Sequence, residues 1–348
     1  MKAAFLYNAN DLRLEETEKP SINDDEILVK VKSAAICGTD IRMFKNGYAG
    51  VDENNPRILG HEISGEIAET GKNVQKYKKG MRVAIAPNMG CGTCDRCVSG
   101  NTHLCETYEA FGINLQGGFA EYLKIPAKAV NQGNLVELDD KISYEEAALV
   151  EPLSCVFNGQ SRVNIELGDT VLIIGAGPIG IMHAFLAKIQ GAVKVFMNDL
   201  SEDRLALCKE LDPDIITVTS AELKEKIMAE TKGNGVDVSI IAAPSPEAQS
   251  SAIELMNMNG RVLFFGGLPK DRENVQLNSN TIHYKQLAVH GSARASLIQY
   301  RKSLALVENG LIPMKKIISS RFKLDEINEA VKKAADGSGL KNVINFED

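Results

Sequence analysis

Apolar residues in the first part of the chain gather into short runs that are separated by glycine and proline. Four runs show this pattern: residues 27–31, 63–69, 81–86 and 119–125. Turn-forming residues such as Gly71, Gly80 and Pro87 stand beside them. Short apolar runs with this punctuation predict β-strands. We therefore expect a barrel-like β domain in this part of the chain.

From about residue 145 the pattern changes to strand-like apolar runs that alternate with helical segments. Strand-like runs lie at residues 169–175, 193–199, 215–218, 236–242 and 261–266. Helical stretches lie between them at residues 178–190, 201–211, 221–231 and 246–258, and Ser201 could cap one of them. Alternation of this kind predicts a parallel, doubly wound sheet, and hence the α/β class.

The length of 348 residues exceeds what one hydrophobic core usually serves, so two domains are expected. The change of pattern places a nucleotide-binding domain at residues 148–285. Beyond it the chain again mixes strand-like and helical pieces, so residues 1–147 and 286–348 are assigned together to a catalytic domain. The strand-like segment 287–291 is our candidate for a contact between subunits.

The composition argues against two classes of partner. The net charge of −7 and the lack of a dense lysine and arginine stripe argue against nucleic-acid binding. No apolar stretch reaches 18 residues, so no membrane span is expected. The apolar part of the N-terminal segment is short and acidic residues follow it at once, unlike a signal peptide, so we expect a cytoplasmic protein.

Four of the seven cysteines, Cys91, Cys94, Cys97 and Cys105, crowd together in the pattern C-x2-C-x2-C-x7-C. Disulfides are disfavoured in a reducing cytosol, so this cluster indicates metal binding. Four thiolates can enclose one tetrahedral zinc and leave no open position, which is typical of a structural site. Gly90, Gly92 and Gly100 help the loop to wrap. The alternative is an iron–sulfur cluster, but the run lacks the C-x3-C-P ending of bacterial ferredoxins.

Residues Gly175-Ala-Gly177-Pro178-Ile179-Gly180 form a G-x-G-x-x-G motif between a predicted strand and a predicted helix. This context predicts a dinucleotide site, with the helix N-terminus facing the pyrophosphate. Asp199 ends the next strand and could accept hydrogen bonds from the ribose hydroxyls, which favours NAD over NADP. Arg204 weakens that preference, because a nearby arginine can accommodate a 2′-phosphate.

A second set of candidate metal ligands lies outside the cysteine cluster. It comprises Cys37, His61, Glu62 and Glu151. One thiolate, one imidazole and one or two carboxylates would give a zinc site with an exchangeable position, which is what zinc catalysis requires. Each residue alone would be unremarkable, so the hypothesis rests on the set.

The chain resembles the medium-chain zinc-dependent alcohol dehydrogenases, and most closely their polyol dehydrogenase branch. The resemblance rests on motifs in family order: Cys37-Gly-Thr-Asp, Gly60-His-Glu-Ile-Ser-Gly-Glu, the four-cysteine lobe, Gly117-Gly-Phe-Ala-Glu-Tyr, Glu151-Pro-Leu and Gly175–Gly180. It implies a GroES-like β-barrel catalytic domain, a Rossmann nucleotide-binding domain, and a homodimer or homotetramer. It also implies one catalytic and one structural zinc, with NAD as the hydride acceptor.

The resemblance also implies roles for single residues. Cys37, His61 and Glu151 would surround the catalytic zinc, with Glu62 as a neighbouring carboxylate that binds directly or through water. Thr39 would hydrogen-bond the substrate oxygen. Arg294 would contact the polyol. The histidine or tyrosine often found soon after the catalytic cysteine is missing, and Ile41–Phe44 stands there instead.

The substrate alternatives follow from these motifs. A secondary alcohol of the polyol or sugar-alcohol type is our first expectation. The segment Arg42-Met-Phe-Lys45-Asn-Gly is similar to galactitol-1-phosphate dehydrogenase and keeps a phosphorylated polyol open. L-Threonine 3-dehydrogenase is another alternative, and a nucleotide-binding structural protein is the non-enzymatic one. Retention of the whole open zinc set argues against the last.

Overall fold

The computed structural model describes residues 1–346, which form two compact units. Unit 1 contains Met1–Ser154 and the chain from Ala295 onward, and unit 2 contains Cys155–Arg294. These limits lie several residues beyond the predicted boundaries at 147/148 and 285/286. The reason at the second boundary is that β16 (Ala288–Gly291) pairs with β15 (Met256–Phe264) and so stays with the sheet of unit 2. Residues 347 and 348, assigned to the catalytic domain, lie outside the described part.

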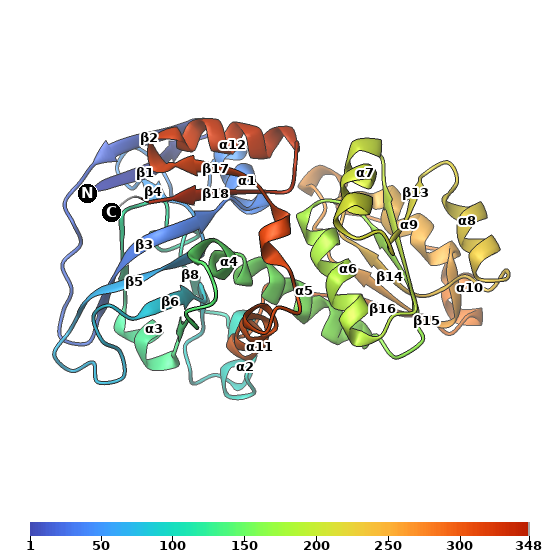
Figure 1. Ribbon diagram of the computed structural model, residues 1–348, viewed down its shortest axis with the longest axis horizontal. Coiled ribbons are helices and arrows are strands. Elements are labelled where there is room, and N and C mark those ends of the chain that lie inside the picture. The colour runs from blue at the N-terminus through green and yellow to red at the C-terminus, as the bar shows by residue number, and fades with distance from the viewer. Residues whose placement is uncertain (347–348) are drawn as a thin grey trace. The chain divides into compact units, whose positions relative to one another are not determined.

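Unit 1 is built on a seven-stranded mixed sheet in which β10, β6, β5, β3, β18 and β17 are neighbours in that order and β9 also pairs with β3. The run from β6 to β17 can be followed in Figure 1. The strands of this sheet are β3 (Ile27–Ala35), β5 (Glu62–Thr70), β6 (Arg82–Ile85), β9 (Tyr122–Ile125), β10 (Leu135–Glu137), β17 (Ile318–Lys323) and β18 (Lys341–Asn345). A three-stranded sheet, β2-β1-β4, and a two-stranded sheet, β7-β8, complete it. Their strands are β1 (Lys2–Asn8), β2 (Asp11–Glu16), β4 (Arg57–Ile58), β7 (Asn88–Met89) and β8 (Glu109–Ala110).

The helices of unit 1 pack at the ends and faces of these sheets. They are α1 (Gly38–Asn46), α2 (Asp95–Val98), α3 (Ala127–Gln132), α4 (Tyr144–Ala148), α11 (Leu297–Glu308) and α12 (Ile327–Asp336), and α5 (Val150–Val163) begins in this unit. Residues of β1, β3, β5 and β6 form one hydrophobic core with α12, in which Ile63, Phe119 and Ile327 are fully buried. This core fixes the ends of β3 and β5, where the candidate metal ligands begin.

Unit 2 is a six-stranded sheet with the order β13-β12-β11-β14-β15-β16, in which all neighbours are parallel. The remaining strands are β11 (Thr170–Ile174), β12 (Lys194–Asp199), β13 (Ile216–Thr219) and β14 (Val236–Ile241). Helices α6 (Pro178–Gln190), α7 (Glu202–Leu211), α8 (Leu223–Glu230), α9 (Pro246–Glu254) and α10 (Ser279–Tyr284) alternate with them along the chain (Figure 1). The strand order reverses between β11 and β14, and dinucleotides bind at such a point.

The predicted fold class is confirmed, and Ser201 caps α7 as expected, since its Oγ accepts a hydrogen bond from the Arg204 N–H at 3.3 Å. One predicted helix is wrong at its end. The expected helix 246–258 stops at Glu254, and β15 begins at Met256. The reason is tertiary pairing, because Met256 is buried and lies beside Val236 in the sheet. No helix in residues 1–346 combines the length and apolar character that crossing a bilayer requires.

Candidate functional site

Cys37 stands between the end of β3 and the start of α1, where Asp40 organises the turn. The Cys37 N–H donates to Asp40 Oδ2 at 2.9 Å, and the Gly60 N–H donates to Asp40 Oδ1 at 3.1 Å. Asp40 is fully buried. This one carboxylate therefore ties the start of α1 to the segment just before β5.

His61 follows Gly60 in that segment, and Glu62 is the first residue of β5. Gly60 has a left-handed φ of 89°, and a Cβ there would lie 2.7 Å from the Phe119 ring, so only glycine fits. Glu62 then pairs with Ala35 across the sheet, beside the chain that leads to Cys37. Ligand atoms of Cys37, His61 and Glu62 consequently lie within 4.8 Å of one another.

The side chains around His61 change the pKa of its imidazole. Nδ1 of His61 lies 3.5 Å from Asp40 Oδ1. Burial lowers the pKa of His61, but interactions with Asp40 and with the Cys37 sulfur outweigh burial, so the pKa is held well above the ordinary 6.5. The surroundings of His61 therefore favour a positive charge on the imidazole.

Glu62 has a buried cationic partner in Lys341, the first residue of β18. Nζ of Lys341 lies 2.6 Å from Oε1 and 2.5 Å from Oε2 of Glu62, and it donates to the Ile36 carbonyl at 2.9 Å. Lys341 is 4% exposed and Glu62 is fully buried. Burial lowers the pKa of Lys341, but Glu62 and Cys37 raise it by more than burial lowers it. The pKa is therefore shifted upward, and the ammonium stays charged.

The donor set fits zinc. A sulfur, an imidazole nitrogen and a carboxylate oxygen are the ligands that zinc prefers, and three protein ligands leave one position for an exchangeable group. Glu151 lies on α5 and is 6% exposed, but it does not belong to the group of atoms within 4.8 Å. Its role as a ligand therefore stays a prediction.

Tyr300 on α11 is a buried neighbour of the same carboxylates. Burial raises its pKa well above 10, and the charges of Glu151 and Glu62 add to the shift. Its hydroxyl has no hydrogen-bond partner within residues 1–346.

Thr39 lies on the first turn of α1. Nη2 of Arg42 donates to its Oγ1 at 3.0 Å. A threonine hydroxyl has two acceptor positions and one donor proton, so one acceptor and the proton remain available.

The four-cysteine cluster has the size of a tetrahedral zinc site. The Sγ atoms of Cys91 and Cys97 are 3.9 Å apart, and those of Cys94 and Cys105 are 3.8 Å apart. A tetrahedron with Zn–S bonds of about 2.3 Å has an edge of about 3.8 Å. Gly90 is required here, because a Cβ would lie 2.4 Å from Sγ of Cys97.

Hydrogen bonds and burial set the thiol acidities in this cluster. The Thr93 hydroxyl and the N–H groups of Thr93 and Cys94 lower the pKa of Cys91 to about 5. Burial raises the pKa of Cys97 to about 12. A cation held by all four sulfurs would favour the thiolate throughout, as zinc ligation requires.

The glycine-rich loop follows β11 and leads into α6, as predicted. Gly175 has a left-handed φ of 111°. A Cβ on Gly180 would lie 1.8 Å from the Gly175 carbonyl oxygen, so only glycine allows this close packing. At Gly177 the Cβ position is open, because no heavy atom of residues 1–346 outside the glycine and its chain neighbours lies within 4 Å of it. This leaves room for a phosphate group above the helix N-terminus that Pro178 and Ile179 begin.

Asp199 ends β12 beside this loop. Its Oδ2 accepts a hydrogen bond from the Ala176 N–H at 2.7 Å, and its Oδ1 accepts one from the Ser201 N–H at 2.9 Å. Nη1 of Arg204 lies 3.8 Å from Oδ2. The carboxylate is thus fixed at the edge of the loop, with an arginine beside it.

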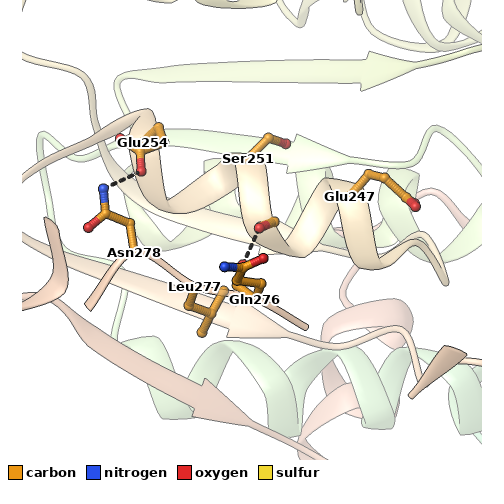
Figure 2. Close-up of a pocket in the computed structure, with 7 residues that line it drawn as sticks. Glu247, Ser251, Glu254, Gln276, Leu277 and Asn278 are labelled. Atoms are coloured by element: carbon orange, nitrogen blue, oxygen red, sulfur yellow. Dashed lines mark hydrogen bonds between the residues drawn. The ribbon is translucent and has the colours of Figure 1, made fainter. Parts of the chain in front are cut away.

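Arg294 lies in unit 2, three residues after β16, and is exposed. A shallow pocket elsewhere in that unit is lined by Glu247, Ser251 and Glu254 of α9 and by residues 276–278 (Figure 2). Asn278 donates to Glu254 at 3.1 Å there, and Ser250 donates to the Gln276 carbonyl. None of the predicted site residues lines this pocket.

The sequence reading missed Asp40, Lys341 and Tyr300. Asp40 could have been found, because it follows Cys37 by three residues in the spacing of a capping box. Nothing in the local sequence connects Lys341 or Tyr300 with Cys37, since the sheet and the core bring them together across about 260 to 300 residues.

Comparisons with known proteins agree with this geometry. Residues 23–134 match the family described as "Alcohol dehydrogenase GroES-like domain", and residues 178–309 match "Zinc-binding dehydrogenase". The chain is 33% identical to sorbitol dehydrogenase of Bacillus subtilis, over 96% of this chain and 93% of the relative. It is 35% identical to sorbitol dehydrogenase of Bombyx mori, with coverage of 99% and 98%. It is 32% identical to L-threonine 3-dehydrogenase of Vibrio parahaemolyticus, with 95% of both chains covered.

The solved structures that resemble this chain are also dehydrogenases. A zinc-binding dehydrogenase from Sinorhizobium meliloti bound to NADP has a TM-score of 0.89 and 29% identity, covering 99% of this chain and 98% of that one. An alcohol dehydrogenase from Escherichia coli complexed with NADH has a TM-score of 0.89 and 28% identity, with 99% of both chains covered. Galactitol-1-phosphate dehydrogenase from Escherichia coli has a TM-score of 0.87 and 26% identity, with coverage of 99% and 100%.

Proposed function

The chain belongs to the zinc-dependent alcohol dehydrogenase family, and we propose that it transfers a hydride between NAD and a secondary hydroxyl group of a polyol or sugar alcohol. The observation that carries the proposal is the convergence of Cys37, His61 and Glu62 within 4.8 Å, with His61 and Glu62 buried and Cys37 partly exposed. A three-ligand set of this kind suits a catalytic zinc because it leaves one position for substrate.

We assign the catalytic zinc to Cys37 and His61, with Glu151 and Glu62 as the competing carboxylates. Zinc held there would act as a Lewis acid that lowers the pKa of a substrate hydroxyl. Lys341 already neutralises Glu62, so Glu151 is our choice for the third ligand. Asp40 would hold His61 in place through the contact between its Oδ1 and the imidazole Nδ1.

Thr39 would receive the substrate proton and pass it on. Arg42 occupies one acceptor position of its hydroxyl, at 3.0 Å, which restricts the rotation of the side chain. The second acceptor position then serves the substrate hydroxyl, and the threonine proton leaves towards water. Thr39→Val should lower kcat by about 10²-fold or more while leaving zinc content unchanged.

NAD is the proposed hydride acceptor, bound at the Gly175–Gly180 loop with its adenosine ribose on Asp199. The fixed carboxylate would repel the extra phosphate of NADP. Asp199→Ala should therefore lower kcat/KM with NAD and raise kcat/KM with NADP relative to that with NAD. Equal or better kcat/KM with NADP in the unaltered enzyme would contradict the assignment.

A phosphorylated polyol is the second candidate substrate, because the Arg42 guanidinium lies against Thr39 and so beside the proposed substrate oxygen. Guanidinium is well shaped for phosphate. A panel of polyols, their phosphates, secondary alcohols and L-threonine, assayed with NAD, separates the candidates. A strong preference for the phosphorylated polyol that disappears in Arg42→Ala or Lys45→Ala would replace our first choice.

A homodimer or homotetramer joined through β16 completes the proposal. Within the described residues β16 is an edge strand with β15 as its neighbour, and Ala288 and Val289 are exposed. An edge strand offers unpaired backbone groups to a second copy. Light scattering that gives only a 37.8 kDa species would exclude it. Cytoplasmic location is part of the same proposal, with cell fractionation as its test.

A further inference from the structure

A buried hydrogen-bond network joins α5 to α6 in unit 2. The side-chain nitrogen of Gln160 on α5 donates to the carbonyl of His183 on α6 at 2.7 Å, and it lies 3.1 Å from Nδ1 of the same histidine. Nε2 of Gln190, the last residue of α6, donates to Oε1 of Gln160 at 3.0 Å. Gln160 and His183 are fully buried, so the bonds between them form away from water.

This network determines which nitrogen of His183 carries the proton. The His183 carbonyl can only accept, so the Gln160 atom that faces it is the amide nitrogen. The second N–H of that nitrogen donates to Nδ1, which leaves the imidazole proton on Nε2. Burial lowers the pKa of His183 to about 3, so the ring is neutral at neutral pH. The hydrogen bonds therefore fix both the tautomer and the orientation of the ring.

The imidazole packs on Phe265, the residue that follows β15. Nε2 of His183 has no hydrogen-bond partner in the described chain, residues 1–346. The His183 and Phe265 ring centroids are 4.7 Å apart and the ring planes meet at 86°, which is the favourable edge-to-face arrangement. Phe265 also lies against α5, because a Cβ on Gly159 would be only 2.9 Å from its Cδ2. Both helices of the network thus contact Phe265.

Phe265 begins a loop that lies beside the glycine-rich loop. The N–H groups of Phe265 and Gly266 both donate to the Ile241 carbonyl, at 3.1 Å and 2.9 Å. A Cβ on Gly266 would lie 2.7 Å from the Ala243 carbonyl oxygen, and a Cβ on Gly175 would lie 3.0 Å from the Ala243 nitrogen. The two loops therefore border the same residue at the carboxyl end of the parallel sheet, which is where dinucleotides bind.

Under the proposed function, the position of Asp199 assigns the two halves of the dinucleotide to different strands. Asp199 ends β12, so the adenosine half would lie on the side of β12 and β13. The pyrophosphate would lie where the strand order reverses, between β11 and β14. The nicotinamide half would then extend over the carboxyl ends of β14 and β15, where Phe265 begins its loop.

We propose that His183 is a positioning residue for the nicotinamide half of the cofactor, because it holds Phe265, and with it the loop 265–268, at the place where that half binds. Gln160 orients the imidazole, and the imidazole supports Phe265. This inference rests on the proposed function, since it requires NAD at the Gly175–Gly180 loop. Neither Gln160 nor His183 belongs to the part of the site that holds adenosine.

Binding of NADH and of ADP to His183→Leu and Gln160→Leu tests the inference. Leucine fills most of the space at either position but can neither donate nor accept a hydrogen bond. We expect Kd for NADH, measured by its fluorescence, to rise about fivefold in each variant. Kd for ADP, measured by calorimetry, should stay unchanged, because ADP lacks the nicotinamide half. An unchanged Kd for NADH in either variant, or an equal rise of Kd for ADP, would overturn the inference.

The double variant shows whether the two side chains act through one contact. His183→Leu combined with Gln160→Leu should raise Kd for NADH no further than either change alone, because both act on Phe265. Phe265→Leu should raise it to the same extent and also leave Kd for ADP unchanged. Multiplied effects in the double variant would show that Gln160 and His183 act separately, and the inference would be wrong.

Ile227→Val is the matched control for loss of stability. Ile227 is fully buried on α8, in the core that contains Leu172 and Ile174, whereas Ile173 between them faces α6. The change therefore lies on the opposite face of the sheet from His183. It should lower the unfolding temperature and leave both Kd values unchanged. An equal rise of Kd for NADH in Ile227→Val would show that destabilisation alone causes the effect.

These measurements need no alcohol substrate, so they separate this inference from the proposed function. Failure of the unaltered protein to bind NADH would overturn the proposed function and this inference with it. Normal binding of NADH that the variants leave unchanged would overturn only the role of His183.

Discussion

Replacement of Lys341 by methionine should strongly destabilise the metal-free protein. Methionine keeps the length of the side chain but removes the ammonium group that lies 2.6 Å and 2.5 Å from the Glu62 oxygens. Both side chains are almost completely buried, at 5% and 0% exposure. The variant would therefore leave a carboxylate buried without its counter-charge, which costs about 3–5 kcal/mol.

Urea unfolding of metal-free protein measures this loss. With an m-value of about 3 kcal/mol per M, the midpoint should fall by about 1–1.7 M. Zinc should restore part of the loss, because a second cation near Glu62 can replace the ammonium. Lys2→Met is the matched control, since Nζ of Lys2 lies 2.9 Å from Asp325 but the pair is half exposed, so its loss should shift the midpoint far less. Equal small shifts in the two variants would refute the reasoning.

Three further predictions concern single groups. Tyr300→Phe should leave stability unchanged or raise it, because the hydroxyl has no hydrogen-bond partner within residues 1–346. Tyr77→Phe, which loses the bond to the Leu135 carbonyl, should instead cost about 1 kcal/mol. Reversed effects of the two variants in urea unfolding would contradict this. Cys94→Ser should remove one zinc per chain and lower the unfolding temperature, and full zinc content by elemental analysis would count against a structural site. Burial lowers the pKa of His183 from 6.5 to about 3, so the unfolded chain takes up this proton first and stability should decline as the pH falls from 6.5 towards 3; an equally steep decline in His183→Gln would exclude this residue as a cause.

Local sequence was sufficient to predict the chemistry that depends on near neighbours. The four cysteines lie within one loop, so their spacing alone predicted a metal cluster. The same holds for the Gly175–Gly180 motif, because a strand, a turn and a helix follow one another there. The predicted fold class was confirmed for the same reason, since strand and helix patterns alternate along unit 2.

Contacts between segments far apart in the chain could not be predicted from local sequence patterns. Lys341 reaches Glu62 only because β18 pairs with β3, and no local pattern encodes this pairing. Tyr300 approaches Glu151 through the packing of α11. The end of α9 was misplaced because pairing of Met256 with Val236 ends the helix, although the residues themselves permit it to continue. Tertiary context decided each of these cases.

The most direct test of the account is the rate of NADH formation from a polyol as zinc is added back to metal-free enzyme. We expect no activity with the first equivalent, which the closed four-sulfur site retains, and a rise that saturates at two zinc ions per chain. The variant His61→Ala should still bind the first zinc at the four-sulfur site but remain inactive when more zinc is added. A rate that is independent of zinc, or that is already complete at one equivalent, would contradict the claim that the site at Cys37 and His61 is the catalytic zinc centre.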